Sequence, residues 1–325
     1  FGTGAIASSA IAMDPNVSGN IVLVYRDPSN GYGYAIFANI NSAGTLSSYS
    51  SSITAFTSLD CDQLDIEFSP NSANQFLVSY DHRASPYHGG TRVGTVSGNG
   101  FAAFGTEVKF SEDAFVKWSS ISFDRNNANK FVVSYTKDWN GTKVCCCKVG
   151  NINGTVITYG AEAVYRTSGG YGKVAFNPTV SGEFIVAFRK IVGSVYDGFA
   201  IKGTVTYGSP DTIAYTGTGT EFRDGTNISL AALSLAFVRT TTFLSGVYNK
   251  FVIAHGFRDA ANEHSGHVIA GQLDETKITV DLATGNFFEV DLQTMNHDIT
   301  IFTISNSSAT YVSSFILKIT QASTA

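Results

Sequence analysis

The sequence has few charged residues: Asp, Glu, Lys and Arg together make up 14% of its 325 residues. A low charge combined with 43% hydrophobic residues excludes an intrinsically disordered chain, which needs the opposite balance. The formal net charge is −5, and Lys and Arg do not cluster, which excludes general binding to nucleic acid. No apolar run of about 18 residues occurs, so the sequence predicts no insertion into a membrane.

Cysteine is also scarce, and four cysteines do not make a disulfide scaffold in a chain of this length. Three of them, Cys145, Cys146 and Cys147, are consecutive, and a strand would point the middle side chain away from its neighbours. A zinc site needs converging pairs of ligands, which the spacing does not offer. We therefore expect small apolar strand residues here, and we predict no metal and no cofactor. Sustained helical periodicity is missing as well.

What the sequence does contain is a hairpin-like unit that recurs about every 55 residues over most of the chain. In its clearest copy, 121–135, Ile121 and Phe123 alternate with serine, an Asn-rich turn follows, and a second β-rich run ends the copy. Two more strand-like runs follow each hairpin. Four strands per unit and a period near fifty predict an all-β fold, the β-propeller. The copies end at Tyr25, Tyr80, Tyr135, Phe188 and, in a stretched copy, His255.

We expect residues 1–325 to form one propeller domain, most simply with six blades, although five or seven remain open. Residues 1–7 resemble a fourth strand and the last unit lacks one, so the termini are expected to share a blade and close the ring. A Gly within the fourth strand, such as Gly105 or Gly160, predicts a bulge or bend. Residues 227–237 could suit a helix by composition, but their place before a hairpin strand predicts a strand. The expected units are 8–56, 57–110, 111–165, 166–222, 223–290, and 291–325 with 1–7.

Residues that break the repeat are the candidate ligand contacts, because repeats supply like residues in a ring whereas a site needs unlike ones. The aromatic and histidine side chains of the predicted loops at one face suit stacking on sugar rings, or else they cover the end of the core. His264 and His267 could hold a metal, but no third ligand is readable, so solvated loop histidines are preferred. The predicted ligand-binding residues are Tyr87, His88, Trp118, Trp139, Tyr171, Tyr196, His264 and His267.

An enzyme would need paired carboxylates. Asp65 and Glu67 alternate with apolar residues and so point to one side of a predicted innermost strand near the axial channel, with Asp60 and Asp62 close by. They are the best acid and base candidates for glycoside cleavage, although an acidic strand can simply solvate the channel. No sialidase-type box, calcium loop, nucleophile elbow, P-loop or dinucleotide fingerprint occurs. The sequence therefore favours a protein that is not an enzyme.

The repeat has a common pattern that runs S-I-x-F-D-P-N, K-F-V-V-x-Y-R-D, G-T-V-S-G and F-G-T-E-V, and it weakens after about Asp224. It is carried by 120–135, by 25–27 with 30–33, by 94–98 and by 104–108. This pattern resembles the repeat of β-propeller proteins of phage tails and virions. The resemblance implies a virion or extracellular location, other virion proteins as partners, and a role in structure or in attachment to a cell-surface glycan; a homo-oligomer stays open.

Three functional hypotheses follow. The first is a non-enzymatic virion propeller, in a tail fibre or on the particle surface, for host attachment through glycan binding or for particle assembly. The second is a polysaccharide-processing glycoside hydrolase or lyase that uses Asp65 and Glu67. The third is a secreted lectin. Because the sequence begins at Phe1, we expect a fragment or a processed chain.

Overall fold

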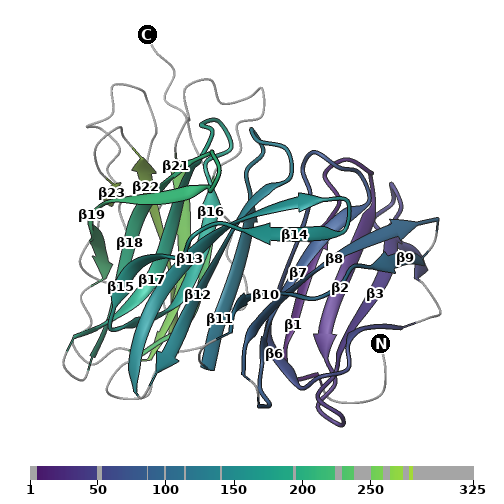
Figure 1. Ribbon diagram of the computed structural model, residues 1–325, viewed down its shortest axis with the longest axis horizontal. Helices are drawn as coiled ribbons and strands as arrows, with labels where there is room; N and C mark the ends of the chain where they lie inside the picture. Colours follow the sequence, from purple (N-terminus) through teal and green to yellow (C-terminus); the bar gives the residue numbers. More distant parts are fainter. Residues whose placement is uncertain are drawn as a thin grey trace.

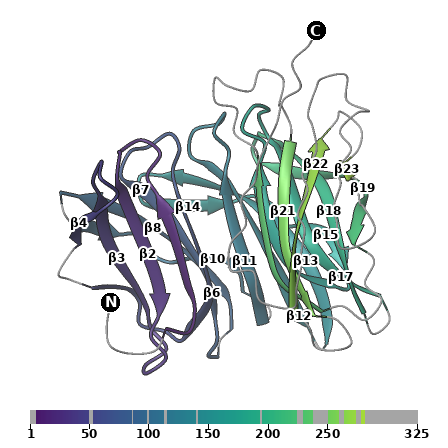
Figure 2. The same ribbon diagram turned by 180° about the vertical axis from the view of Figure 1, so that it is seen from behind.

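The computed structural model of the chain consists of antiparallel β-strands joined by turns (Figures 1 and 2). It describes residues 6–49, 53–85, 87–98, 100–112, 115–139, 141–192, 195–223, 229–237, 250–258, 264–273 and 278–280. Within these ranges there are strands and no helix, which confirms the all-β prediction. The same ranges therefore hold no helix that could cross a membrane.

The strands form five sheets, each made by one continuous part of the chain. The first three sheets have five strands each: β1 (Ser9–Met13), β2 (Asn20–Arg26), β3 (Gly33–Ile40), β4 (Leu46–Tyr49) and β5 (Thr54–Thr57); β6 (Cys61–Phe68), β7 (Gln75–His82), β8 (Gly89–Ser97), β9 (Gly100–Phe104) and β10 (Val108–Ser111); β11 (Phe115–Phe123), β12 (Lys130–Trp139), β13 (Thr142–Asn153), β14 (Val156–Tyr159) and β15 (Ala163–Thr167). The last two have four each: β16 (Gly169–Phe176), β17 (Glu183–Val192), β18 (Val195–Thr206) and β19 (Thr212–Arg223); β20 (Ser229–Phe237), β21 (Lys250–Arg258), β22 (His264–Leu273) and β23 (Ile278–Val280).

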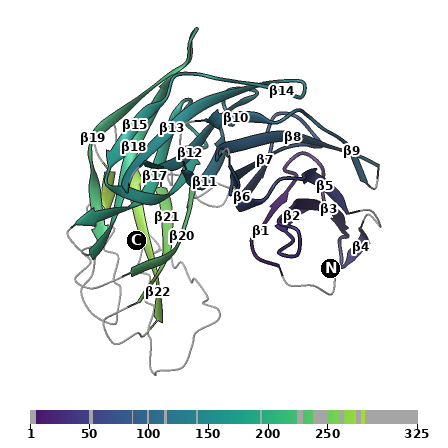
Figure 3. The same cartoon turned by 60° about the horizontal axis from the view of Figure 1, so that its bottom comes forward.

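The five sheets follow one another along an arc as the blades of a β-propeller (Figure 3). The first strands of successive blades contact each other, β1 with β6, β6 with β11, β11 with β16 and β16 with β20, so they line the inner side. The propeller prediction is confirmed. The described residues form five blades where six were expected, and the sixth unit, 291–325 with 1–7, lies outside them except for residues 6 and 7. The amide of Ala7 donates to the carbonyl of Arg26 in the first blade.

Apolar side chains from neighbouring blades interdigitate to form a separate core at each joint. Leu64, Ile66 and Phe68 of β6, for example, pack on Val22 and Phe37 of the first blade. The cysteine run obeys the same geometry, because Cys145 and Cys147 join the core with the fourth blade while Cys146 joins the core with the second. These cysteines are buried strand residues, as expected.

Each blade after the first carries a Phe on its second strand directly opposite a Gly on its third. In the third blade Phe131 pairs with Gly150, and a methyl group at Gly150 would lie 2.0 Å from the Phe131 ring. The aromatic ring thus covers the glycine and fills the space beside it, a packing unit that fixes the register of the two strands. The other pairs are Phe76 with Gly94, Phe184 with Gly203 and Phe251 with Gly271.

The glycines of the predicted fourth strands have a role beyond bending the strand. In the second blade the strand is interrupted after Phe104 and resumes as β10. A methyl group at Gly105 would lie 2.5 Å from the carbonyl oxygen of Thr155 in the third blade. Glycine is therefore required because the next blade approaches closely. The segment 227–237 could suit a helix by composition, but its residues 229–237 form strand β20, as predicted.

Candidate active site in the axial pocket

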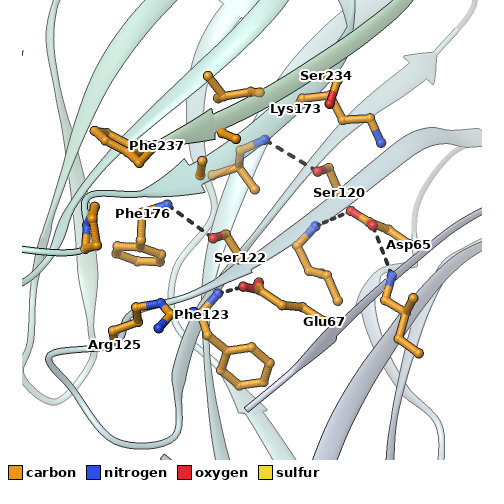
Figure 4. Close-up of a pocket in the computed structure, with 17 residues that line it drawn as sticks. Asp65, Glu67, Ser120, Ser122, Phe123, Arg125, Lys173, Phe176, Ser234 and Phe237 are labelled. Carbon is orange, nitrogen blue, oxygen red and sulfur yellow. Dashed lines mark hydrogen bonds between the residues drawn. The ribbon is translucent and has the colours of Figure 1, made fainter. Parts of the chain in front are cut away.

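A cavity of about 290 Å³ lies between the first strands of the second to fifth blades (Figure 4). Its walls are main chain and side chains of β6, β11, β16 and β20, which makes it the axial pocket of the propeller. Four charged side chains line it: Asp65 and Glu67 from β6, Arg125 from the turn after β11, and Lys173 from β16. Opposite charges thus gather where the blades converge.

Asp65 and Glu67 line this pocket, as the alternation along β6 predicts, and they also connect two blades. The amide of Ile121 donates to Oδ2 of Asp65 at 3.0 Å, and the amide of Phe123 donates to Oε2 of Glu67 at 2.9 Å (Figure 4). A second amide, that of Ile66, donates to Oδ1 of Asp65 at 3.0 Å. Charge-assisted bonds of this kind fix the positions of both carboxylates on the pocket wall.

The joint between the third and fourth blades is bridged in the same way, by hydrogen bonds from backbone amides to neutral side chains. Ser120 and Ser122 occupy the positions of Asp65 and Glu67 one blade later, and their hydroxyl oxygens accept from the amides of Val174 at 3.4 Å and of Phe176 at 3.2 Å. A serine is therefore sufficient to bridge the blades at this position. The acidic residues of β6 add negative charge to the pocket that the bridging role alone does not require.

Asp60 and Asp62, expected close to this pair, instead form ion pairs. Asp60 accepts from Arg26 of the first blade at 2.8 Å, and Asp62 lies 3.3 Å from Arg83. Neither lines the axial pocket. Arg26 ends β2 of the first blade and Asp60 directly precedes β6 of the second, so this ion pair is a contact between blades.

Trp118 and Tyr171 come together as a stacked pair with ring centroids 3.8 Å apart. They were expected in loops, but they lie within β11 and β16. Each of these inner strands begins several residues before the alternating apolar residues that predicted it, and each contains a register shift. Both are partly buried. Of the predicted ligand contacts, these two are brought into direct contact with each other.

His88 is not a surface contact. It is 3% exposed, its ring stacks on that of His82 with centroids 4.4 Å apart, and its Nε2 lies 2.8 Å from Oε1 of Glu107. The hydroxyl of Tyr80 donates to the same carboxylate. His88 therefore belongs to a buried polar network at the end of β7. Tyr87, beside it in sequence, packs on Phe115 with centroids 3.7 Å apart.

The remaining predicted contacts are strand residues whose side chains lie outside the described part of the structure. Trp139 ends β12, and Tyr196 lies in β18. His264 and His267 were expected in a loop, yet both lie in β22, which begins at His264 and pairs along its whole length with β21. The Gly and polar residues around His264 and His267 predicted a loop, but regular strand pairing includes both histidines.

Two residues near the pair of Trp118 and Tyr171 were missed by sequence reasoning. Asp81 and Arg189 occupy equivalent positions in the second strands of their blades, where the third blade has Thr136. The change from Asp to Thr to Arg at one repeat position is the signal that could have found them. Arg189 is 8% exposed and its guanidinium lies 3.7 Å from the centroid of the Tyr171 ring.

No protein-family model and no curated protein matches the chain. Solved structures do resemble it. A thermostable family-43 glycoside hydrolase is 10% identical, with 86% of this chain and 93% of that chain covered and a TM-score of 0.43. The Bombyx mori GH32 β-fructofuranosidase BmSUC1 is 12% identical over 88% and 66%, with a TM-score of 0.46. Sqt1 from Chaetomium thermophilum is 12% identical over 83% and 70%, with a TM-score of 0.40.

These identities concern the fold alone. Two of the three are named as glycoside hydrolases. The first hypothesis from the sequence, a non-enzymatic virion propeller for attachment or assembly, is corrected by these matches and is not retained.

Proposed function

We propose that the protein is a polysaccharide-processing glycoside hydrolase whose catalytic centre is the axial pocket. The observation that supports this is the pair of carboxylates, Asp65 and Glu67, fixed on one wall of a cavity of about 290 Å³. Glycoside hydrolysis needs two carboxyl groups beside the scissile bond, one as general acid and the other as base or nucleophile. Arg125 and Lys173 supply hydrogen-bond donors for sugar hydroxyls in the same cavity.

The strand geometry supports a specific division of roles. The α-carbons of alternate strand residues lie about 6.6 Å apart. Inverting glycosidases hold their two carboxyl groups about 6.5 to 9.5 Å apart so that a water fits between them. Both carboxyl oxygens of Asp65 accept from amides, and we assign this residue as the base that activates the water. Glu67 is then the acid that protonates the leaving oxygen.

Amide variants separate catalysis from the bridging role. Asp65→Asn and Glu67→Gln each keep an oxygen that can accept from the amide of Ile121 or Phe123, but neither can transfer a proton as a carboxyl group does. We expect each to lower kcat about 100-fold or more while Tm changes little. The measurement is release of reducing ends from a panel of polysaccharides, with the anomeric configuration of the first product followed by NMR.

Glu112→Gln is the matched control, because Glu112 lies on the surface with 71% of its side chain exposed. It should hydrolyse at the wild-type rate. Wild-type protein that releases no reducing ends from any substrate, or amide variants as active as wild type, would overturn the proposal. A product with retained configuration would overturn the division of roles between Asp65 and Glu67.

A further inference from the structure

Three cationic side chains surround the stacked pair of Trp118 and Tyr171. The Arg189 guanidinium lies 3.7 Å from the Tyr171 ring centroid, and the amino groups of Lys117 and Lys143 lie 5.9 Å and 5.6 Å from the Trp118 centroid. The cations come from three strands, β11, β13 and β17. We call these five residues the cationic stack. The carboxylate of Asp138 pairs with Lys117 at 3.3 Å.

The backbone beneath the stack shows that its aromatic side chains are not dictated by the fold. Trp118 and Tyr171 both have a φ of 58°, in the left-handed region, and the equivalent residue of β6 is Gln63 with a φ of 50°. This conformation costs a side-chain-bearing residue about 1 to 2 kcal/mol, and Gly or Asn meets it more easily. The bulge therefore requires the conformation but does not explain two large aromatic rings in adjacent blades.

The stack adjoins the axial pocket. Trp118 lies two residues before Ser120 on β11, and Tyr171 lies two residues before Lys173 on β16, and both Ser120 and Lys173 line the pocket. Two residues of a strand span at most about 7 Å. Positive charge is therefore present both in the stack and, at Lys173, on the wall of the pocket that Asp65 and Glu67 line.

We propose that the cationic stack binds the carboxylate or sulfate groups of an acidic polysaccharide, which makes this the substrate class of the hydrolase; the inference rests on the proposed function. The protein as a whole carries a net charge of −5, so a polyanion is repelled unless cations are gathered locally. The contacts with Trp118 and Tyr171 hold the cations in place. Guanidinium and ammonium groups then bind carboxylate or sulfate oxygens by charge-assisted hydrogen bonds.

The test measures binding to polygalacturonate, to dextran sulfate and to neutral dextran by affinity electrophoresis, using the Asp65→Asn variant so that no substrate is consumed. We expect retardation by an anionic polymer and none by dextran. Lys117→Gln and Lys143→Gln should each weaken the binding about tenfold and reduce its dependence on salt concentration. Lys109→Gln, the same loss of charge on β10, should bind like the parent variant.

Retardation by polygalacturonate identifies a uronate as the recognised group, and retardation by dextran sulfate alone identifies a sulfate ester. Equal binding to dextran, no binding to either polyanion, or lysine variants that bind as well as the parent would overturn the inference. The two proposals fail separately. Wild-type protein that binds the polyanion without cleaving it contradicts the hydrolase and leaves the anion site standing, whereas cleavage of a neutral polysaccharide alone contradicts the anion site and leaves the hydrolase standing.

Discussion

Asp81 shows how one residue that departs from the repeat acquires a special environment. It is 2% exposed at the joint between the second and third blades, close to the bulge that carries Trp118. Burial raises the pKa of Asp81 to about 7, the nearby Asp62 adds to the shift, and the hydroxyl of Ser119 and the amide of Trp118 oppose it. The carboxyl group therefore carries a desolvation cost once it ionises.

This cost gives the stability a defined dependence on pH. In the unfolded chain Asp81 ionises near pH 4, whereas in the folded protein it ionises near pH 7. Between these values the folded state holds a proton that the unfolded state has lost, so stability falls as the pH rises. We expect Asp81→Asn to be more stable than wild type at pH 8, by up to about 4 kcal/mol, and equally stable at pH 4.

Urea unfolding of both proteins at pH 4, 6 and 8 checks this prediction. Asp27→Asn is the control: hydrogen bonds from Ser29 lower the pKa of Asp27, so its contribution is lost only at more acidic pH and the slope between pH 4 and 8 should not change. A stability difference between Asp81→Asn and wild type that is the same at all three pH values would contradict the raised pKa.

At the same scale, the sequence could predict which way a side chain points but not what it meets. Alternation placed Asp65 and Glu67 on the channel side of β6, because the period of a strand is two residues. Their amide partners, Ile121 and Phe123, belong to the next blade, and the offset between blades is not encoded in either strand alone. For the same reason His88 was expected at the surface, although Glu107, nineteen residues later, holds it in the interior.

At the scale of strands, the Phe and Gly pair is the element that the repeat preserves most faithfully from the second blade to the fifth. The Phe131 ring is fully buried, so the structure around it cannot yield easily. We expect Gly150→Ala to destabilise the protein by about 1 to 3 kcal/mol because its methyl group overlaps the ring. Chemical denaturation measures the change.

Gly100→Ala is a matched control for this prediction, since Gly100 also lies in a strand but has open space where a methyl group would be placed. It should change the stability by less than about 0.5 kcal/mol. If both variants lost the same stability, the cost would come from replacing a strand glycine in general, and the packing explanation would be wrong.

At the scale of the whole molecule, the period of the repeat predicted the propeller because every blade reuses one pattern of strands and turns. The number of blades was harder to predict, since the pattern weakens after about Asp224 and the count depends on its last copies. The contacts that join the blades could not be predicted from the repeat pattern, because each core combines residues from two units. One such core contains Leu77, Val93, Ile121 and Phe123. Each blade is thus completed by its neighbour.

Shared cores of this kind predict that the described blades unfold together. Both tryptophans of the chain, Trp118 and Trp139, belong to the third blade, and Trp118 stacks on Tyr171 of the fourth. Their fluorescence therefore reports on the third blade and its joint with the fourth, whereas far-ultraviolet circular dichroism reports on all strands. Because the third blade shares one core with the second and another with the fourth, we expect the two signals to give the same Tm within about 1 °C. Gly150→Ala, although it alters only the third blade, should lower both midpoints equally. Fluorescence that changes at a lower temperature than the circular dichroism in this variant would show that the third blade opens alone and that the joints do not couple the blades.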